Sequence, residues 1–582
     1  MRRIANARTQ FVCGSGFAAF VASVFAAPAS AQTPPPTQGI PSREEVTPPA
    51  PEETAAPNVS VDSREAVVRS TCPFEGSELT LNLSAVTYAR PDGSPVQPEI
   101  AEALSGVDHA TGAQPLKVVC DIRDAANAAL ARSGYIASVQ IPPQNIDTGT
   151  LQLHVITARL TEVRVRGTPG PYADTLAARV EQLKSLDPLN EKDAERALLL
   201  AGDIPGLDVQ LALRPAGTAP GDVIGDLNIT YRPFAILANA QNYNSRQLGR
   251  ETVYLRAEAY GLTGLSDVTY VGAQSTVDFE EQKIAQIGHI FGLNSSGTTL
   301  GGRFTYAWSR PDLDVLDLRT NTLIAGVDLR HPLVRSLTTN VALSGGFDYV
   351  DQDTRVFSGG SGTLLNLDKL RIGYLRLDGD YRTPPAQTGV SFSIEGGVEL
   401  RKGFDIFDAT PQGSFQASRI AGNSEAFVVR ADADAVIGVG PIFSLAGSAR
   451  AQWTDDPLLN YEEFSLGNLT IGRGYDPGAN SGDRAVGVRG EVRANIPVGE
   501  DFGVQAFGFY DKVWLTNLDP GSTEVDRDFG SWGGGVRVTL PNRMLLEVTY
   551  AKPEDKALTI DAAPPTDRVL VSLTLQFRAG AR

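Results

Sequence analysis

The sequence is poor in the residues from which enzyme and metal sites are usually built. Only four histidines occur among 582 residues, at 109, 154, 289 and 331, and their spacing matches no metal-ligand motif. Motifs such as CxxC, GxSxG, HExxH and the Walker A loop are missing. Acidic residues are abundant, but nothing pairs them for acid–base catalysis. We therefore expect no enzyme activity, no cofactor and no metal.

Long apolar runs and basic charge are also scarce. Beyond the first 31 residues no run of about 18 apolar residues occurs, which excludes a membrane-spanning helix by length. The formal net charge is −17, whereas a nucleic-acid surface needs clustered Lys and Arg. A broad nucleic-acid surface is therefore excluded, and a membrane role would require a barrel of strands.

The N-terminus has the features of a secretory signal peptide. Three arginines precede an apolar stretch at 17–27, and Ala-Ser-Ala at 29–31 is the small-residue pattern that signal peptidase reads. We expect a signal peptide over 1–31 and export from the cytoplasm. Cys13 precedes the apolar stretch, which is not where the acylated cysteine of a lipoprotein lies.

Two of the three cysteines, Cys72 and Cys120, remain after this cleavage. In an oxidising compartment they form either a disulfide within the first folded domain or two unpaired thiols. The sequence does not give the distance between them, so both interpretations stay open here.

A Pro- and Glu-rich stretch at 32–57 follows the signal and has few large apolar side chains. Such a composition does not offset the entropy lost on ordering, so we expect a flexible linker over 32–71. A short helix around 42–46 fits the sequence but would be marginal on its own.

The next part of the chain, 72–233, predicts two small α+β domains in tandem, over 72–158 and 159–233. The first is expected to run strand, helix, helix, strand, strand, over 79–83, 98–104, 122–132, 139–141 and 151–155. The second repeats this order over 163–165, 177–186, 194–201, 207–213 and 227–231. Recurrence of one order at about 75 residues indicates a structural repeat.

From 234 to 582 the helical pattern stops, and alternating segments of about ten residues follow. In the last one the apolar face holds Val569, Val571, Leu573, Leu575 and Phe577, and the polar face holds Arg568, Ser572, Thr574 and Gln576. One face suits lipid and the other suits water. The length allows about 16 strands at about 22 residues per strand and connection.

A soluble β-sandwich gives the same alternation, but three observations favour a barrel. The signal peptide sends the chain to the cell envelope. All four tryptophans (308, 453, 514 and 532) lie in this half, where a barrel needs interfacial aromatics. The predicted inner faces carry charges that a sandwich core would not tolerate. We expect a closed transmembrane β-barrel of about 16 antiparallel strands preceded by two α+β domains.

Arg473, Gly474 and Tyr475 lie in a long connection between two late strands. By composition this is a Gly-rich surface loop. It also resembles the R-G-Y motif in the sixth extracellular loop of the outer-membrane transporters of two-partner secretion, the TpsB family of the FhaC/ShlB haemolysin-exporter type. Counting back from Phe577 predicts strands fifteen to twelve at 545–550, about 532–540, 504–514 and 485–496, which puts Arg473 in the sixth loop.

Weaker motifs occur in the same order as in this family, over about 72–582. Phe509-Tyr510-Asp511 is similar to F-x-D-x-G, although Val513 replaces the Gly, and Glu491 faces the lumen where the family has an acidic residue. Residues 189–201 and 204–207 resemble the helix and PG turn of the second POTRA domain. Residues 264–267 resemble the glycine and aspartate pattern of the first barrel hairpin.

The resemblance implies a function in protein export. The α+β domains would be periplasmic POTRA domains that bind an unfolded exoprotein, a TpsA-type haemolysin or adhesin, and the barrel would thread it to the cell surface without ATP. Outer-membrane lipid, the barrel-assembly machinery and a monomeric state are implied as well. The family often has an N-terminal helix that plugs the barrel, and the Pro-rich stretch predicts a poorly formed helix here.

The site expected from this comparison is an anchor for the sixth loop. The planar guanidinium of Arg473 can bind two carboxylate oxygens, so we expect it to pair with Asp511, with Phe509 and Glu491 nearby. Two alternatives remain. A barrel-assembly factor of the same superfamily usually has more POTRA domains than the two that fit before 234, and a porin-like solute channel would have an unrelated periplasmic module.

Overall fold

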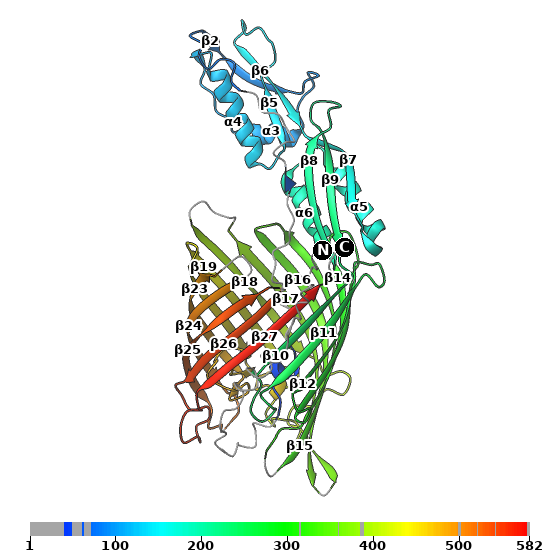
Figure 1. Cartoon of the computed structure of the whole chain (residues 1–582), viewed down its shortest axis with the longest axis vertical. Coiled ribbons are helices and arrows are strands. Elements are labelled where there is room, and N and C mark those ends of the chain that lie inside the picture. Colours follow the sequence, from blue (N-terminus) through cyan, green and yellow to red (C-terminus); the bar gives the residue numbers. More distant parts are fainter. Residues whose placement is uncertain are drawn as a thin grey trace, which may run out of the picture.

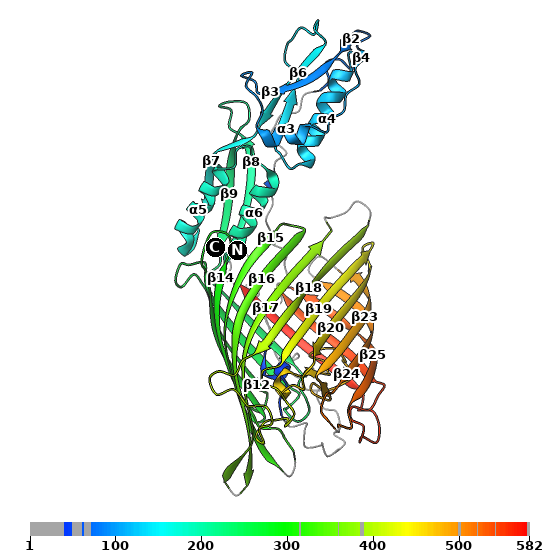
Figure 2. The same ribbon diagram turned by 180° about the vertical axis from the view of Figure 1, so that it is seen from behind.

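The structure is a computed structural model, and it describes residues 40–48, 61–62, 71–313, 316–358, 360–383, 389–498, 502–520, 522–541 and 543–578. The expected signal peptide and most of the expected linker lie outside these residues. Two α+β domains stand in a row beyond one end of a β-barrel (Figure 1 and Figure 2). We call this the near end of the barrel, and the opposite end the far end. Within the described ranges, no helix is both long and apolar enough to cross a bilayer.

The first α+β domain has a three-stranded sheet in the order β3 (Ala85–Ala89), β6 (Thr150–Thr157), β5 (Ala137–Gln140). Helices α3 (Pro98–Leu104) and α4 (Val118–Arg132) share one core with this sheet. The expected first strand at 79–83 is present, but it lies outside this sheet. Its residues form β2 (Thr80–Leu83), which pairs with β4 (Gly112–Pro115) in a separate ribbon, because the next apolar run, β3, takes the position beside β6.

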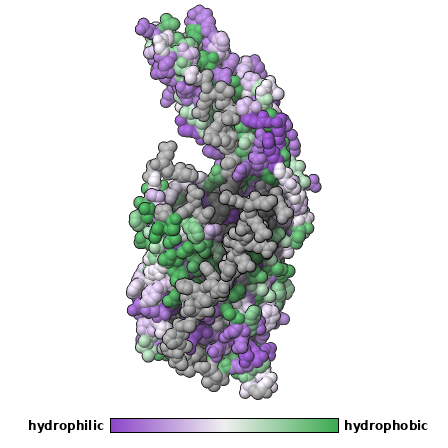
Figure 3. Space-filling model, viewed as in Figure 1, coloured by the Kyte–Doolittle hydropathy of each residue, from purple (hydrophilic) through white to green (hydrophobic). Residues whose placement is uncertain are grey.

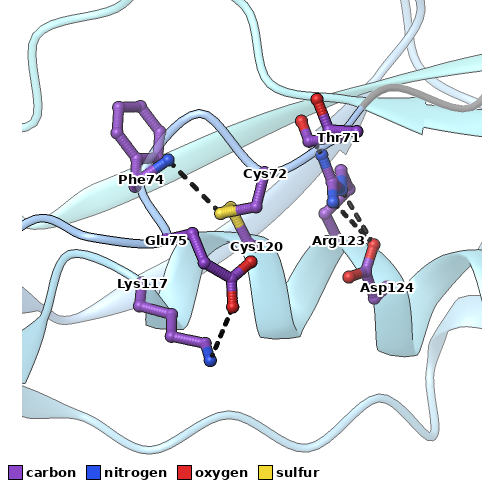
Figure 4. The surroundings of a disulfide bond; sticks show 8 residues. All are labelled: Thr71, Cys72, Phe74, Glu75, Lys117, Cys120, Arg123 and Asp124. Atoms are coloured by element: carbon purple, nitrogen blue, oxygen red, sulfur yellow. Dashed lines mark hydrogen bonds and ion pairs between the residues drawn. A yellow bond between two sulfur atoms is a disulfide. The ribbon is translucent and has the colours of Figure 1, made fainter.

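A disulfide between Cys72 and Cys120 lies at the start of this domain (Figure 4). Their Cα atoms are 5.8 Å apart, and the bond joins the residues before β2 to the first turn of α4. The Nη1 of Arg123, one turn further along α4, donates to the carbonyl oxygen of Thr71 at 3.4 Å. The chain entering the domain is therefore held at two neighbouring points.

The second α+β domain has strands β7 (Arg159–Gly167), β8 (Leu207–Pro215) and β9 (Asp222–Tyr231), with helices α5 (Ala173–Lys184) and α6 (Glu191–Gly202) and the short 3₁₀ helix η1 (Gly170–Tyr172). Asn190 caps α6 by accepting from the Lys192 backbone N–H at 2.9 Å. Leu176 of α5 and Leu198 of α6 are buried in the core against the sheet.

Two pieces of the expected linker have fixed positions, so the prediction of one flexible linker over 32–71 is corrected. Strand β1 (Val61–Asp62) pairs in parallel with the outer edge of β8, opposite Leu211 and Ala212. The one-turn helix α2 (Arg43–Val46) lies inside the outline of the barrel in both views. Contacts of α2 with polar and apolar side chains of the barrel stabilise this short helix, which would be marginal in isolation.

In the described part of the chain, sixteen antiparallel strands form a closed barrel. They are β10 (Phe234–Gln241), β11 (Thr252–Tyr260), β12 (Val268–Thr276), β13 (Gln282–Gly292), β14 (Thr299–Ser309), β15 (Asp317–Arg335), β16 (Thr339–Ser358), β17 (Ser361–Arg382), β18 (Val390–Gly403), β19 (Phe427–Val439), β20 (Phe443–Thr454), β23 (Arg484–Pro497), β24 (Gly503–Thr516), β25 (Asp526–Leu540), β26 (Met544–Pro553) and β27 (Arg568–Arg578). The expected fold class is confirmed, and the four late strands lie where the count placed them.

Closure is made by β10 and β27, which pair from Ala235–Arg578 to Gln241–Ser572. Hydrophobic residues gather on the barrel wall, whereas hydrophilic residues predominate on the α+β domains (Figure 3). The four tryptophans are each 45–48% exposed, as expected for aromatic residues on the outer face. Side chains that alternate with the outward ones along the strands point into the lumen, and charged residues such as Arg401, Glu491 and Asp511 are buried there.

The second α+β domain is docked on the near end. The hydroxyl of Tyr231 donates to the carbonyl oxygen of Tyr260 at 2.7 Å, and Arg335 pairs with Asp203 of the domain at 2.5 Å. Gly206 of the PG turn has φ +81°, and a Cβ there would come within 2.8 Å of the Tyr260 ring. The PG turn is therefore a point of close contact between domain and barrel.

Removing the disulfide is expected to loosen the first α+β domain. The Cys72→Ser/Cys120→Ser variant releases a loop with a sequence separation of 48, which costs about 2–4 kcal/mol of domain stability. Hydrogen exchange of the α4 amides in the full-length protein measures this, with the barrel amides as the internal control. Unchanged exchange in α4 would show that the bond contributes nothing.

Candidate functional site

The connection 455–483 between β20 and β23, the sixth at the far end, folds back into the barrel, and we call it L6. It contains the 3₁₀ helix η2 (Asn460–Glu462) and the two-residue strands β21 (Phe464–Ser465) and β22 (Ser481–Gly482). Its Leu466 and Ile471 are buried in one cluster with Val513 of the wall. Val513, which stands where the similar family has Gly, therefore packs against L6. Gly472 has φ +116°, a backbone angle that favours glycine where the loop reverses.

Arg473 of L6 forms an ion pair with Glu491 on the inner face of β23. Glu491 is 4% exposed and also pairs with Arg493 at 2.7 Å and with Arg537 at 3.2 Å. The guanidinium carbon of Arg473 lies 4.5 Å from the centroid of the Phe509 ring. The loop cation is therefore held between a buried carboxylate and an aromatic face.

The expected side-chain pair between Arg473 and Asp511 is wrong. The Oδ2 of Asp511 instead accepts from the backbone N–H groups of Gly472 at 3.1 Å and Arg473 at 2.8 Å. Both carboxylate oxygens accept from Arg489, at 2.8 and 3.1 Å. Arg489 is directly opposite Asp511 in the ladder, so the carboxylate is neutralised by its neighbour, whereas Glu491 faces Phe509 and is left for the loop cation.

Gly474 and Tyr475 fit the wall by shape. A Cβ on Gly474 would lie 2.7 Å from the Pro553 nitrogen, so only glycine allows this approach. The Tyr475 side chain is fully buried, and its hydroxyl accepts from the Asp555 N–H at 3.0 Å and lies 2.9 Å from the Gly530 carbonyl oxygen. All three residues of the expected motif therefore touch strands β23 to β26 or their connections.

A second anchor holds the start of L6 to β18 and β19, which are separated from β23 by β20 alone. Glu462 accepts two hydrogen bonds from Arg401 of β18, at 3.0 and 3.1 Å, and one from Arg430 of β19 at 3.0 Å. Burial by itself would raise the pKa of Glu462, but the charges of Arg401, Arg430 and Arg43 outweigh it and lower the pKa to about 2. Glu462 therefore stays charged at all physiological pH values.

A third contact ties L6 to the two neighbouring far-end connections. Arg419, in the connection 404–426, pairs with Glu463 and Asp483 of L6, each at 2.6 Å, and with Asp519 of the connection 517–525 at 2.8 Å. One guanidinium thus joins three connections. Asp483 is fully buried, so the junction is shielded from water.

The segment 40–48 lies beside L6 in the lumen. Val46 is buried in one cluster with Ile324 and Val350 of the wall and Leu459 and Tyr461 of L6. The side chain of Gln282 donates to the carbonyl oxygen of Glu45 at 3.1 Å. The expected plug helix is short, since α2 has only one turn. The segment nevertheless lies inside the barrel, in contact with its inner wall.

A capping box gives this short segment its shape. The backbone N–H of Ser42 donates to the Glu45 carboxylate at 3.0 Å, and the Glu45 N–H donates back to the Ser42 hydroxyl at 3.4 Å. Burial raises the pKa of Glu45 to about 7, although hydrogen bonds from Ser245 and Ser42 oppose the shift. A carboxyl group in the lumen segment therefore titrates near neutral pH.

Sequence reasoning missed Arg401, Arg419, Glu462 and Asp483. Alternation carried a usable signal for Arg401, since Leu400 beside it faces outward. Irregular loops have no such periodicity, so the partners of Arg419 and Glu462 could not be read from spacing. Arg489 was visible as an inward-facing residue of β23, but its pairing depends on the register with β24.

Comparisons with known proteins agree with this architecture. Residues 227–538, just over half of the chain, match the protein family described as haemolysin secretion/activation protein ShlB/FhaC/HecB. The outer membrane transporter CdiB-2 of Burkholderia pseudomallei is 23% identical over 428 residues, 68% of this chain and 67% of that protein. The heme/hemopexin transporter protein HuxB of Haemophilus influenzae is 19% identical over 438 residues, covering 72% and 74% of the two chains.

Solved structures share the fold. CdiB from Escherichia coli matches with a TM-score of 0.67 at 17% identity, over 88% of this chain and 94% of that chain. CdiB from Acinetobacter baumannii matches with a TM-score of 0.62 at 14% identity, over 96% of both chains. Two α+β domains before a closed 16-stranded barrel are thus the fold that this chain shares with these outer-membrane transporters. The chain belongs to the ShlB/FhaC/HecB family, and it is a transporter of the two-partner secretion type.

Glu491 and Asp511 are expected to show different coupling free energies with Arg473 in double-mutant cycles. Arg473→Ala and Glu491→Gln break the same ion pair, so their effects on barrel stability should be non-additive by about 1 kcal/mol or more. Asp511 is hydrogen-bonded to Arg473 only through the backbone N–H of Arg473, so the coupling between Arg473→Ala and Asp511→Asn should be weaker than that between Arg473→Ala and Glu491→Gln. Unfolding midpoints in detergent measure both cycles. Equal coupling in the two would contradict the assignment.

The lumen segment should leave the barrel more readily as the pH rises. The charged carboxylate is the unfavourable form in the lumen, so seating is favoured below the ordinary pKa of 4.5 and weakens as the pH passes about 7. Planar-bilayer conductance of the full-length protein should increase across that range. In the Glu45→Gln variant the increase should be absent, and a variant that keeps it would rule out Glu45 as the titrating group.

Proposed function

We propose that this transporter carries a partner exoprotein of the haemolysin or adhesin type from the periplasm to the cell surface without ATP. The observation that carries the proposal is a closed barrel whose lumen holds L6 and the segment 40–48, both fixed through side-chain contacts. Such contacts can be exchanged for contacts with a passing chain. The near end then faces the periplasm and the far end faces the exterior.

The POTRA domains would receive the unfolded exoprotein, with the second domain as the main contact. An extended chain binds most simply by adding to a free sheet edge. The edge of β8 supports this proposal because it pairs with an extended segment, β1, in parallel register, and a partner chain would take the place of that two-residue strand. Docking of the same domain on Tyr260 and Arg335 would bring a bound chain to the mouth of the barrel.

The proposal extends to partners that the family membership leaves open. We propose a monomer in outer-membrane lipid, inserted by the barrel-assembly machinery. Two alternative functions are distinguished by simple observations. A barrel-assembly factor would be required for other barrels to insert. A porin-like channel would conduct solutes constitutively, even without the POTRA domains, whereas a filled lumen favours a closed resting state.

The anchor of L6 should be required for export. Arg473→Ala and Asp511→Ala should each lower secretion of the partner, because L6 then loses its fixed position in the lumen. A neighbouring gene for a large secreted β-helical protein would identify that partner. Arg484→Ala is the matched control, since Arg484 pairs with the exposed Asp455 at the mouth of the barrel. Export is read as partner protein in the medium, normalised to folded barrel in the membrane. Wild-type export by both variants, with normal insertion, would contradict the proposal.

A further inference from the structure

The connection 404–426 begins on the outside of the barrel wall. Phe404 continues the outward face of β18, and its backbone N–H donates to the Arg371 carbonyl oxygen of β17 at 2.9 Å. A Cβ on Gly373 would lie 2.9 Å from the Phe404 ring, so the glycine leaves room for it. We call residues 404–408, which cross the outer face of β17, the wall segment.

Arg371 lies beneath the wall segment and is fully buried, although its side chain is on the outer face of β17. Its neighbours Leu370 and Ile372 belong to the lumen cluster of Val46, which fixes the direction of Arg371 by alternation. The guanidinium donates to the carbonyl oxygens of Phe407 at 3.1 Å and Val350 at 2.9 Å. It also pairs with Asp351 at 2.8 Å and lies 3.5 Å from the Tyr349 ring centroid.

The wall segment turns apolar side chains away from this charge. Phe407 is 69% exposed, and Phe404 and Ile406 are 44% and 43% exposed. Phe407 and Asp408 both have positive φ, 50° and 56°, which is unfavourable for residues other than glycine. Strain of this kind persists only where surrounding contacts impose it, and here the Phe407 carbonyl is fixed by Arg371. The strained turn holds the Phe407 ring out from the wall.

The outward side chains around the wall segment indicate the environment of its exposed apolar side chains. On β17 the outward residues below it are apolar, including Leu375 and Leu377, each 48% exposed. Toward the far end, charged residues occupy the next outward positions, Lys369 on β17 and Asp351 and Asp353 on β16, with Leu367 of β17 opposite Asp353. The wall segment therefore lies at the boundary between the lipid-facing band and the polar far end.

We propose that Ile406 and Phe407 insert into the acyl chains of the outer leaflet and form a lipid-binding foot for the connection 404–426. The proposal rests on the orientation in the proposed function, with the far end outside the cell. The same connection carries Arg419, which joins L6 and the connection 517–525. Outer-leaflet lipid is thus a ligand that fixes the start of the connection 404–426, while Arg419 near its end binds L6.

Depth-dependent fluorescence quenching tests the foot directly. Cys72 and Cys120 are bonded to each other, so a mature Phe407→Cys protein has one free thiol for an NBD label. Phe415→Cys is the matched control, because Phe415 is in the same connection and 90% exposed. Both are reconstituted in phosphatidylcholine vesicles that contain a lipid spin-labelled near the headgroup or near the chain end.

The probe at 407 should be quenched by the spin-labelled lipid, more strongly by the shallow label, and should be protected from aqueous iodide. The probe at 415 should show the reverse. Equal iodide access at both positions would overturn the proposal. Protection from iodide without lipid quenching would overturn it as well, because another protein or a second copy would then cover the segment.

A second variant tests how the foot is positioned. Arg371→Met removes the donor to the Phe407 carbonyl and leaves an apolar side chain that suits the outer face of the wall. The probe at 407 should then become accessible to iodide, while the probe at 415 stays unchanged. A probe that keeps its lipid contact in this variant would exclude Arg371 as the positioning residue. None of these readouts depends on export, so they succeed or fail independently of the proposed function.

Discussion

The ion pair between Arg473 and Glu491 fixes where L6 lies, and the filling of the lumen depends on that position. A closed barrel leaves no free strand edge in lipid, so control of passage falls to whatever occupies its interior. L6 is held in that interior at two points, at Glu462 by β18 and β19 and at Arg473 by β23. Its buried charges are individually paired, which makes the resting position specific and a partial displacement costly.

The remaining elements of the far end are connected to this loop. Arg419 joins L6 to two neighbouring connections, and the segment 40–48 packs against Leu459 and Tyr461 of L6. The linker that carries this segment continues to β1 on the second POTRA domain and to the disulfide of the first. The described parts of this stretch therefore contact the barrel and both α+β domains.

Periodicity explains which parts were predictable. The alternation in β24 placed Phe509 and Asp511 in the lumen, and strand counting placed Arg473 in the sixth loop, because both depend on local spacing. The pairing of Arg473 was predicted incorrectly, since it depends on the register that puts Arg489 opposite Asp511. The lodging of 42–46 in the barrel was also missed, because its position there depends on contacts with Gln282 and the wall, which local spacing does not reveal.

The central claim is that the lumen contents must move for export to occur. Gln282 donates to the carbonyl oxygen of Glu45, the residue before Val46, so cysteines at Val46 and Gln282 allow the segment to be joined to the wall by a photocleavable bismaleimide. The account predicts that the cross-linked transporter inserts normally but does not secrete its partner, and that light restores secretion. Secretion at the wild-type rate with the cross-link intact would contradict it.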